Sequence, residues 1–235
     1  MNNPARPLKG LLFDKDGTLF DFQGTWGAWA VSFITELSEG VPGRMEKLAQ
    51  AVWLDLDTAS FAPESPVIAG TQDEMLELVC GSVPDVSRAE ILSLMERSVV
   101  RAPLVPAVPL EPYLTGLRER GLALGIATND SEAGARAHIG RANVTHLFDF
   151  IVGFDSGYGG KPEPGQLLAF AEQMGLAPQE IAMVGDSTHD LHAAHAAGMV
   201  GIGVLTGVAP REELSPHADV VLRDIGEIPR WLDDI

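Results

Sequence analysis

The chain has 235 residues, enough for one large domain or for one domain with a smaller insert. Hydrophobic residues make up 46% and charged residues 21%, which is typical of a globular protein and excludes a disordered chain. The net charge of −17 disfavours binding to nucleic acid and to anionic membrane surfaces. An anionic substrate would therefore need a metal ion, or a local Lys or Arg, at its binding site.

Cysteine content and the length of the apolar runs indicate the cellular compartment in which the protein is expected. The single cysteine, Cys80, excludes an intramolecular disulfide, which suits a reducing cytoplasm. Residues 1–10 lack the apolar run of a secretory leader. No apolar stretch approaches the roughly 20 residues that a membrane-spanning helix needs. We therefore expect a cytoplasmic protein that does not bind membranes, either a monomer or a homodimer.

Short apolar runs that read as buried strands are the first predicted elements along the chain. They cover residues 11–13, 122–127, 150–152, 181–184, 200–204 and 220–222. Helical patterns lie between the later runs, at residues 113–120, 131–141, 165–174 and 190–197. This alternation of strands and helices predicts right-handed crossovers, and hence a doubly wound α/β domain with a parallel sheet.

Residues 23–106 interrupt this alternation. Apolar side chains recur there at helical spacing, as in Trp26, Trp29, Phe33 and Leu37, and Pro and Gly residues separate the segments. We interpret this region as an inserted all-helical domain, and residues 1–22 with 107–235 as the α/β core domain.

Polar residues follow four of the predicted strands at the point where each strand ends. In chain order they are Asp14 and Asp16, Thr128 and Asn129, Lys161, and Asp186 with Asp190. Because ligands of open α/β sheets bind beyond the carboxyl ends of the strands, we expect these side chains to share one edge of the sheet.

Four carboxylates in one cleft repel one another and raise one another's pKa, unless a cation lies among them. Oxygen atoms of Asp side chains, with water, are the ligands that Mg²⁺ prefers. A neighbouring Lys and a Thr hydroxyl could bind phosphate oxygens. Such a set suits phosphoryl transfer, in which catalysis consists mostly of positioning and charge neutralisation.

Four motifs in order give the chain a family resemblance. Residues 13–19 (FDKDGTL), 127–130 (ATND), 160–164 (GKPEP) and 185–190 (GDSTHD) resemble the four motifs of haloacid dehalogenase-superfamily phosphatases. The layout is similar to that of phosphoglycolate phosphatases and covers residues 8–207. The insert carries no motif, but its length and helical character resemble the family's cap domain.

The resemblance implies roles for the residues of the first motif. Asp14 would be the nucleophile, forming an aspartyl-phosphate, and would also bind Mg²⁺. Asp16 would be the general acid and base, with its backbone carbonyl on the metal ion. The implied activity is Mg²⁺-dependent hydrolysis of a small phosphate monoester, similar to phosphoglycolate, so the implied partner is a small phosphorylated metabolite.

The resemblance also implies roles for the other three motifs. Thr128 and Asn129 would bind the transferring phosphoryl group, and Lys161 would neutralise both this group and the nucleophile. Asp186 would bind Mg²⁺ directly. Asp190 would bind Mg²⁺ through water or orient Lys161.

Several alternatives remain open on the sequence alone. The same core could serve a phosphosugar mutase, or a non-catalytic module that binds phosphate or a protein partner.

Lys15 replaces the apolar residue that is commoner between the two aspartates, and its side chain could point away from the site or contribute to local electrostatics. His189, His192 and His195 could suggest an imidazole-bound metal, but their spacing rotates around the helix, so we expect exposed polar side chains.

Overall fold

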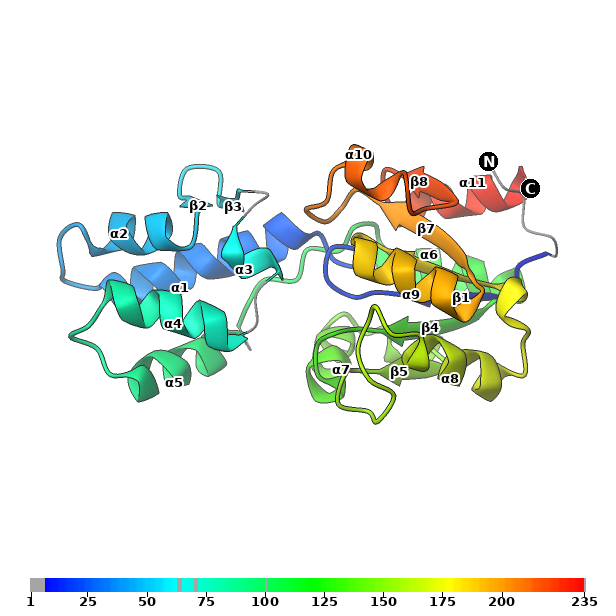
Figure 1. Cartoon of the computed structure of the whole chain (residues 1–235), viewed down its shortest axis with the longest axis horizontal. Coiled ribbons are helices and arrows are strands. Elements are labelled where there is room, and N and C mark those ends of the chain that lie inside the picture. The colour runs from blue at the N-terminus through cyan, green and yellow to red at the C-terminus, as the bar shows by residue number, and fades with distance from the viewer. Residues whose placement is uncertain (1–6, 63–64, 70–71, 100, 235) are drawn as a thin grey trace. The chain divides into compact units, whose positions relative to one another are not determined.

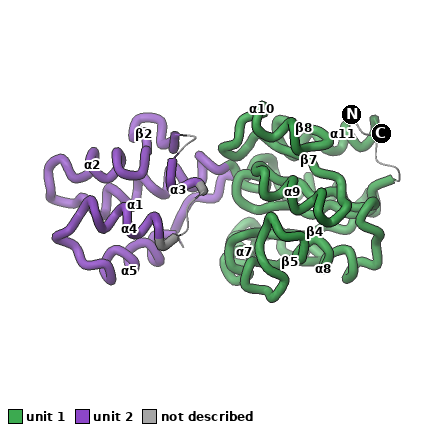
Figure 2. Tube along the Cα trace, viewed as in Figure 1, with its two compact units in different colours: residues 1–21, 106–235 green, residues 22–105 purple. Residues whose placement is uncertain are grey.

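The computed structural model describes residues 7–62, 65–69, 72–99 and 101–234. The chain divides into two compact units, of which one comprises Met1–Asp21 with Pro106–Ile235 and the other Phe22–Val105 (Figure 2). Residues 1–6, over which no secretory leader is predicted, lie outside the described residues. No helix in the described ranges is long and apolar enough to cross a membrane.

The first unit contains a sheet of six parallel strands in the order β5-β4-β1-β6-β7-β8 (Figure 1). The strands are β1 (Gly10–Phe13), β4 (Ala123–Ala127), β5 (Phe150–Val152), β6 (Ile181–Gly185), β7 (Val200–Val204) and β8 (Val220–Leu222). The order reverses between β1 and β6, as it does in doubly wound sheets. The predicted α/β fold with a parallel sheet is therefore confirmed.

Helices connect the strands of this unit. They are α6 (Leu110–Glu119), α7 (Glu132–Arg141), α8 (Gly165–Met174), α9 (Thr188–Ala197), α10 (Arg211–Leu214) and α11 (Ile228–Asp233), with single 3₁₀ turns at Thr145–Leu147, Pro178–Glu180 and Ile225–Glu227. On one face of the sheet, Phe170 of α8 and Ala194 of α9 are fully buried in a cluster with strand residues such as Met183. This packing fixes the start of α9, where the fourth motif lies.

Strand register aligns the ends of the central strands. Phe13, the last residue of β1, pairs with Ile126 of β4 and with Val184 of β6. Asp14 follows Phe13 directly, while Thr128 and Asp186 each lie two residues beyond these partners. The three side chains therefore come to the same edge of the sheet.

The second unit is helical and has its own core. It contains a π-helical turn η1 (Gln23–Gly27) and the helices α1 (Ala28–Ser38), α2 (Arg44–Ala51), α3 (Pro66–Ala69), α4 (Gln72–Ser82) and α5 (Arg88–Val99). Phe33, Leu76 and Ile91 are buried members of its apolar cluster. The Nε1 of Trp29 donates a hydrogen bond of 2.9 Å to the Ser98 hydroxyl, joining α1 to α5.

One detail of this unit differs from the all-helical expectation. A short antiparallel ladder pairs β2 (Leu54–Asp55) with β3 (Ser60–Phe61). The turn between them forms because Oδ1 of Asp55 accepts hydrogen bonds of 2.9 Å from the backbone N–H groups of Asp57 and Thr58. Such local Asp-to-backbone bonding competes with helix formation, and the short ladder was not visible in the helical apolar pattern.

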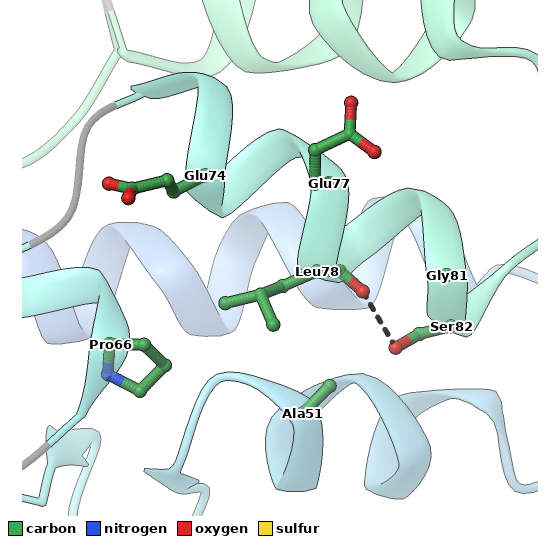
Figure 3. A pocket seen from close by; sticks show the side chains of 7 residues that line it. All are labelled: Ala51, Pro66, Glu74, Glu77, Leu78, Gly81 and Ser82. Carbon is green, nitrogen blue, oxygen red and sulfur yellow. Dashed lines mark hydrogen bonds between the residues drawn. The ribbon is translucent and has the colours of Figure 1, made fainter.

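The helical unit also contains an open hollow of about 780 Å³ between α2, α3 and α4 (Figure 3). The Leu78 side chain points toward α2, and Ala51 points back toward α4. The hydroxyl of Ser82 donates to the Leu78 carbonyl at 3.0 Å. None of the residues that line the hollow is a predicted site residue, so it is a separate feature of this unit.

Candidate active site

The ammonium group of Lys161 is the centre of the site. Its Nζ lies 2.8 Å from Oδ1 of Asp14 and 2.6 Å from Oδ1 of Asp190. Lys161 and Asp190 are buried, while the Asp14 side chain keeps 14% of its surface exposed. Lys161 thus joins the end of β1 to the start of α9, and Asp14 remains accessible to a small ligand.

Burial and neighbouring charges shift the pKa values of the carboxyl groups in the site. Burial raises the pKa of Asp14 to about 6, Lys161 lowers it, and the neighbouring carboxylates of Asp190 and Asp16 raise it. Burial and the charges of Asp14 and Asp190 also raise the pKa of Asp186 well above its usual range. For Lys161, burial acts to lower the pKa, but Asp14 and Asp190 raise it overall, so its ammonium stays charged.

Three carboxylates fit a metal ion. Oxygen atoms of Asp14, Asp186 and Asp190 all lie within 4.8 Å of one another. When all three are ionised, they carry more negative charge than the ammonium group of Lys161, which contacts Asp14 and Asp190, can balance. Since a divalent cation with oxygen ligands would balance this charge, the donor set fits a hard metal ion.

Asp190 is held rigidly within the fourth motif. Its Oδ2 accepts hydrogen bonds from the Ser187 N–H at 3.1 Å and from the Ser187 hydroxyl at 2.6 Å. Its Oδ1 accepts a hydrogen bond from Nζ of Lys161 at 2.6 Å. The bonds between Ser187 and Asp190 form the capping box at the start of α9. Both oxygens of Asp190 are therefore used within the protein, which favours orientation of Lys161 as its role.

Glycine residues allow the backbone to approach the buried carboxylates. A Cβ atom on Gly17, whose φ is +76°, would lie 2.3 Å from Oδ2 of Asp186. A Cβ on Gly207 would lie 1.7 Å from the same oxygen, and one on Gly185 would lie 2.2 Å from the Asp190 side chain. Side chains at these positions would displace the carboxylates, so the loops around the site require glycine.

Comparison with known proteins identifies the family to which the chain belongs. The model of the haloacid dehalogenase-like hydrolase family matches residues 8–198. The chain belongs to this family. It is 34% identical over 239 residues to a phosphoglycolate phosphatase of Shigella dysenteriae, with 96% of this chain and 93% of the relative covered. It is 27% identical over 261 residues to the phosphoglycolate phosphatase of Escherichia coli, with the same coverage.

Solved structures show the same fold. A putative beta-phosphoglucomutase from Thermotoga maritima has a TM-score of 0.74 and 18% identity, with 97% of this chain and all of that chain covered. At this identity the likeness concerns the fold alone. The sequence-based prediction that the chain is a haloacid dehalogenase-family hydrolase is confirmed.

The second motif of this hydrolase lies against the third. The Asn129 side-chain amide donates to the Lys161 carbonyl at 2.9 Å, and its Oδ1 accepts from the Lys161 N–H at 2.8 Å. Thr128 is buried, and its hydroxyl accepts from the Asp130 N–H at 3.1 Å. The Asn129 side chain therefore fixes the Lys161 loop, a use that the sequence did not indicate, and Thr128 lies at the predicted edge of the sheet.

Asp16 is placed differently from the other aspartates. It is not part of the carboxylate group that could hold a metal, and Nζ of Lys15 contacts its Oδ2 at 2.5 Å. Lys15 is completely buried and also contacts Asp130 and His138. Of the two expectations for Lys15, the structure favours local electrostatics, because its side chain points to Asp16.

Two neighbours of Lys15 were missed by the sequence analysis. Asp130 lies within the second motif, which was a usable signal, but its contact with Lys15 depends on the sheet register. His138 carries no motif, since only the folding of α7 brings it near the first motif. The histidines of α9 fit the expectation, because His189, His192 and His195 are all exposed.

Proposed function

We propose that the protein is a Mg²⁺-dependent phosphatase that hydrolyses a small phosphate monoester through an aspartyl-phosphate on Asp14. The observation that carries the proposal is the position of Lys161, which lies between Asp14 and Asp190 beside a third carboxylate, the buried Asp186. A nucleophilic carboxylate is of use in such an anionic site only if cations neutralise the incoming phosphate. The named relatives, which are phosphoglycolate phosphatases, support the same reaction class.

Asp14, Asp186 and the backbone carbonyl of Asp16 would hold the Mg²⁺, with Asp190 reaching it through water or acting on Lys161 alone. The metal ion would supply charge neutralisation and orientation for the phosphate. Lys161 supplies a second positive charge that the chain provides itself. Thr128 donates its hydroxyl, and Asn129 its backbone N–H, to the remaining phosphoryl oxygens.

In the first step, an oxygen of Asp14 attacks phosphorus, and the bond from phosphorus to the leaving oxygen breaks. The electron pair of that bond goes to the leaving oxygen, which takes a proton from Asp16. The products are an alcohol and phospho-Asp14. The covalent intermediate divides one high barrier into two lower ones.

In the second step, water attacks the phosphorus of phospho-Asp14 while Asp16 takes the proton of the water. The bond from phosphorus to Asp14 breaks, and its electron pair returns to the carboxylate. Inorganic phosphate leaves, and Asp16 is again protonated for the next cycle. Asp16 therefore acts first as acid and then as base.

Residues 23–106 form the proposed cap domain, which would close over the substrate and exclude water. The net charge of −17 disfavours nucleic acid, and a small anionic metabolite would be bound through the positive charges of Mg²⁺ and Lys161. Phosphoglycolate is the proposed substrate type because the two relatives named above are phosphoglycolate phosphatases. A cytoplasmic location, and a monomer or homodimer, stay predictions.

A panel of phosphate esters, assayed for kcat/KM with Mg²⁺ and with EDTA, tests this function. The proposal predicts release of inorganic phosphate from small monoesters, dependent on Mg²⁺, with phosphoglycolate among the better substrates. If no ester in the panel releases phosphate with Mg²⁺, the protein is a binding module. Isomerisation of a sugar phosphate, dependent on a bisphosphate and without net phosphate release, would instead indicate a mutase.

A further inference from the structure

A buried lysine lies between the two aspartates of the first motif. The Lys15 side chain is fully buried, although it carries a charge. Its Nζ is 2.5 Å from Oδ2 of Asp16, 2.9 Å from Nδ1 of His138 and 3.2 Å from Oδ2 of Asp130. An ammonium group has three N–H donors, and three acceptors lie close to this one, in the loop after β1, the loop before α7 and α7 itself.

The charges of these groups follow from their surroundings. The carboxylates of Asp16 and Asp130 lie 2.5 Å and 3.2 Å from Nζ of Lys15 and favour its charged form. Burial and the charge of Lys15 lower the pKa of His138, which keeps its imidazole neutral. Nδ1 of His138 therefore accepts the hydrogen bond, and Lys15 donates all three contacts.

The acceptors opposite Asp16 are themselves fixed. Oδ1 of Asp130 accepts from the Ser131 N–H at 2.7 Å, and Ser131 caps the N-terminus of α7 by accepting from Gly134 at 3.1 Å. His138 lies on the same helix and is buried. Lys15 therefore links the Asp16 carboxylate to a rigid helix and to the loop of the second motif.

We propose that Lys15 is a positioning residue for Asp16, which orients the carboxylate for proton transfer to the leaving oxygen. This inference rests on the proposed function, in which Asp16 is the general acid. A side chain that serves only to fill the core would not need a charge, and burying an ammonium group is costly unless it is paired. The charged end of Lys15 instead contacts polar groups, and one of them is the carboxylate of Asp16.

The test compares leaving groups. Only a poor leaving group needs a proton in the first step, and kcat/KM reports the steps up to release of the alcohol. We therefore measure kcat/KM for p-nitrophenyl phosphate and for the best alkyl phosphate of the ester panel, with Mg²⁺, for wild type, Lys15→Met and Asp16→Ala. Methionine is similar in length to lysine and lacks its charge.

The expected result is a selective loss. Asp16→Ala should lower kcat/KM for the alkyl ester by about 10²–10⁴-fold and leave the nitrophenyl ester much less affected. Lys15→Met should lower kcat/KM for the alkyl ester by roughly 10–100-fold, because misplacing a catalytic group by about 1 Å has effects of this size. It should change kcat/KM for the nitrophenyl ester by less than about 3-fold.

Two further variants complete the experiment. Lys9→Met removes the ion pair between Lys9 and Glu180, at 2.8 Å in the same unit, and should leave the ratio of the two substrates unchanged. If Lys15→Met does not fold, Asp130→Asn carries the test, because it removes one anchor of Lys15 with little change in shape. It should give the same selective loss, smaller in size.

The outcomes separate the two proposals. Suppose that Asp16→Ala loses activity selectively on the alkyl ester. The positioning role is then overturned if the folded Lys15 or Asp130 variant loses kcat/KM equally on both esters, or loses none on the alkyl ester. If Asp16→Ala itself shows no dependence on the leaving group, Asp16 is not the acid, and the proposed mechanism fails together with this inference.

Discussion

Two buried lysines in the α/β unit lie beside Asp14 and Asp16, the aspartates with proposed catalytic roles, and the surroundings of the two lysines differ. Lys161 contacts Asp14 and Asp190, with Asp186 close by, so one positive charge faces three carboxylates. Lys15 contacts Asp16 and Asp130 together with the neutral His138, so one positive charge faces two carboxylates.

The difference in charge between the surroundings of Lys161 and of Lys15 indicates different roles for the two lysines. Around Lys161, burial raises the pKa of Asp14 to about 6, Lys161 lowers it, and the carboxylates of Asp190 and Asp16 raise it. Three ionised carboxylates beside one ammonium group need a further cation. Around Lys15 a neutral imidazole takes the place of the third carboxylate. We therefore assign charge neutralisation of the substrate to the Lys161 centre and orientation of a proton donor to the Lys15 centre.

The largest expected effect comes from removing the nucleophile. Asp14→Asn should lower kcat/KM by about 10⁴-fold or more for every ester, because the isosteric amide is a poor nucleophile. The measurement is phosphate release across the ester panel, with circular dichroism to check the fold. Activity within tenfold of wild type would show that Asp14 is not the nucleophile.

Lys161→Met tests directly whether the two lysines have different roles. We expect a loss of about 10²–10³-fold in kcat/KM, the usual effect of removing one group that stabilises a developing anion. The loss should be similar for nitrophenyl and alkyl esters, since phosphate charge is the same in both. A loss confined to alkyl esters, which is the pattern expected of Lys15→Met, would assign Lys161 to proton transfer instead.

Gly207→Ala probes the metal site without removing a ligand. The added Cβ would lie 1.7 Å from Oδ2 of Asp186, so this carboxylate must shift. We expect the Mg²⁺ concentration for half-maximal activity to rise by about 10–100-fold, as is usual when the surroundings of a metal ligand change. Gly203→Ala is the matched control, because its Cβ would make an ordinary contact of 3.4 Å with Leu214. Equal effects of the two variants would contradict the assignment of Asp186.

The smallest effect concerns stability. Asp14 has a pKa of about 6 in the folded protein against an ordinary value of 3.8, so between these values the folded state binds more protons than the unfolded state. The free energy of unfolding of the metal-free protein should therefore fall as pH rises through this window. Mg²⁺ at about 100 times its Kd should restore about 2.7 kcal/mol.

Thermal unfolding checks this at about pH 5 and pH 7.5, with Mg²⁺ and with EDTA. The increase in Tm on adding Mg²⁺ should be roughly 5–10 °C at the higher pH and smaller at the lower one. Asp14→Asn should raise the Tm of the metal-free protein at the higher pH. A metal-free Tm that rises between the two pH values would contradict the charge assignment.

The sequence predicted the strands of the sheet because their apolar runs are short, separate and followed by polar motifs. It predicted the edge at which Asp14, Thr128 and Asp186 meet, since parallel strands end together. The surroundings of Lys15 could not be predicted, because His138 reaches it only through the packing of α7. The β2–β3 ladder was missed because a single Asp55 side chain determines that turn.

The different tasks of Asp14 and Asp16 are tested most directly by the reaction of Asp16→Ala with p-nitrophenyl phosphate. The good leaving group should allow Asp14 to be phosphorylated, while hydrolysis is slow without the base. We predict a burst of one p-nitrophenol per enzyme molecule, with one phosphoryl group on the Asp14 peptide by mass spectrometry after acid quench. Phosphate on another residue, or turnover in this variant without any phosphoenzyme, would contradict the account.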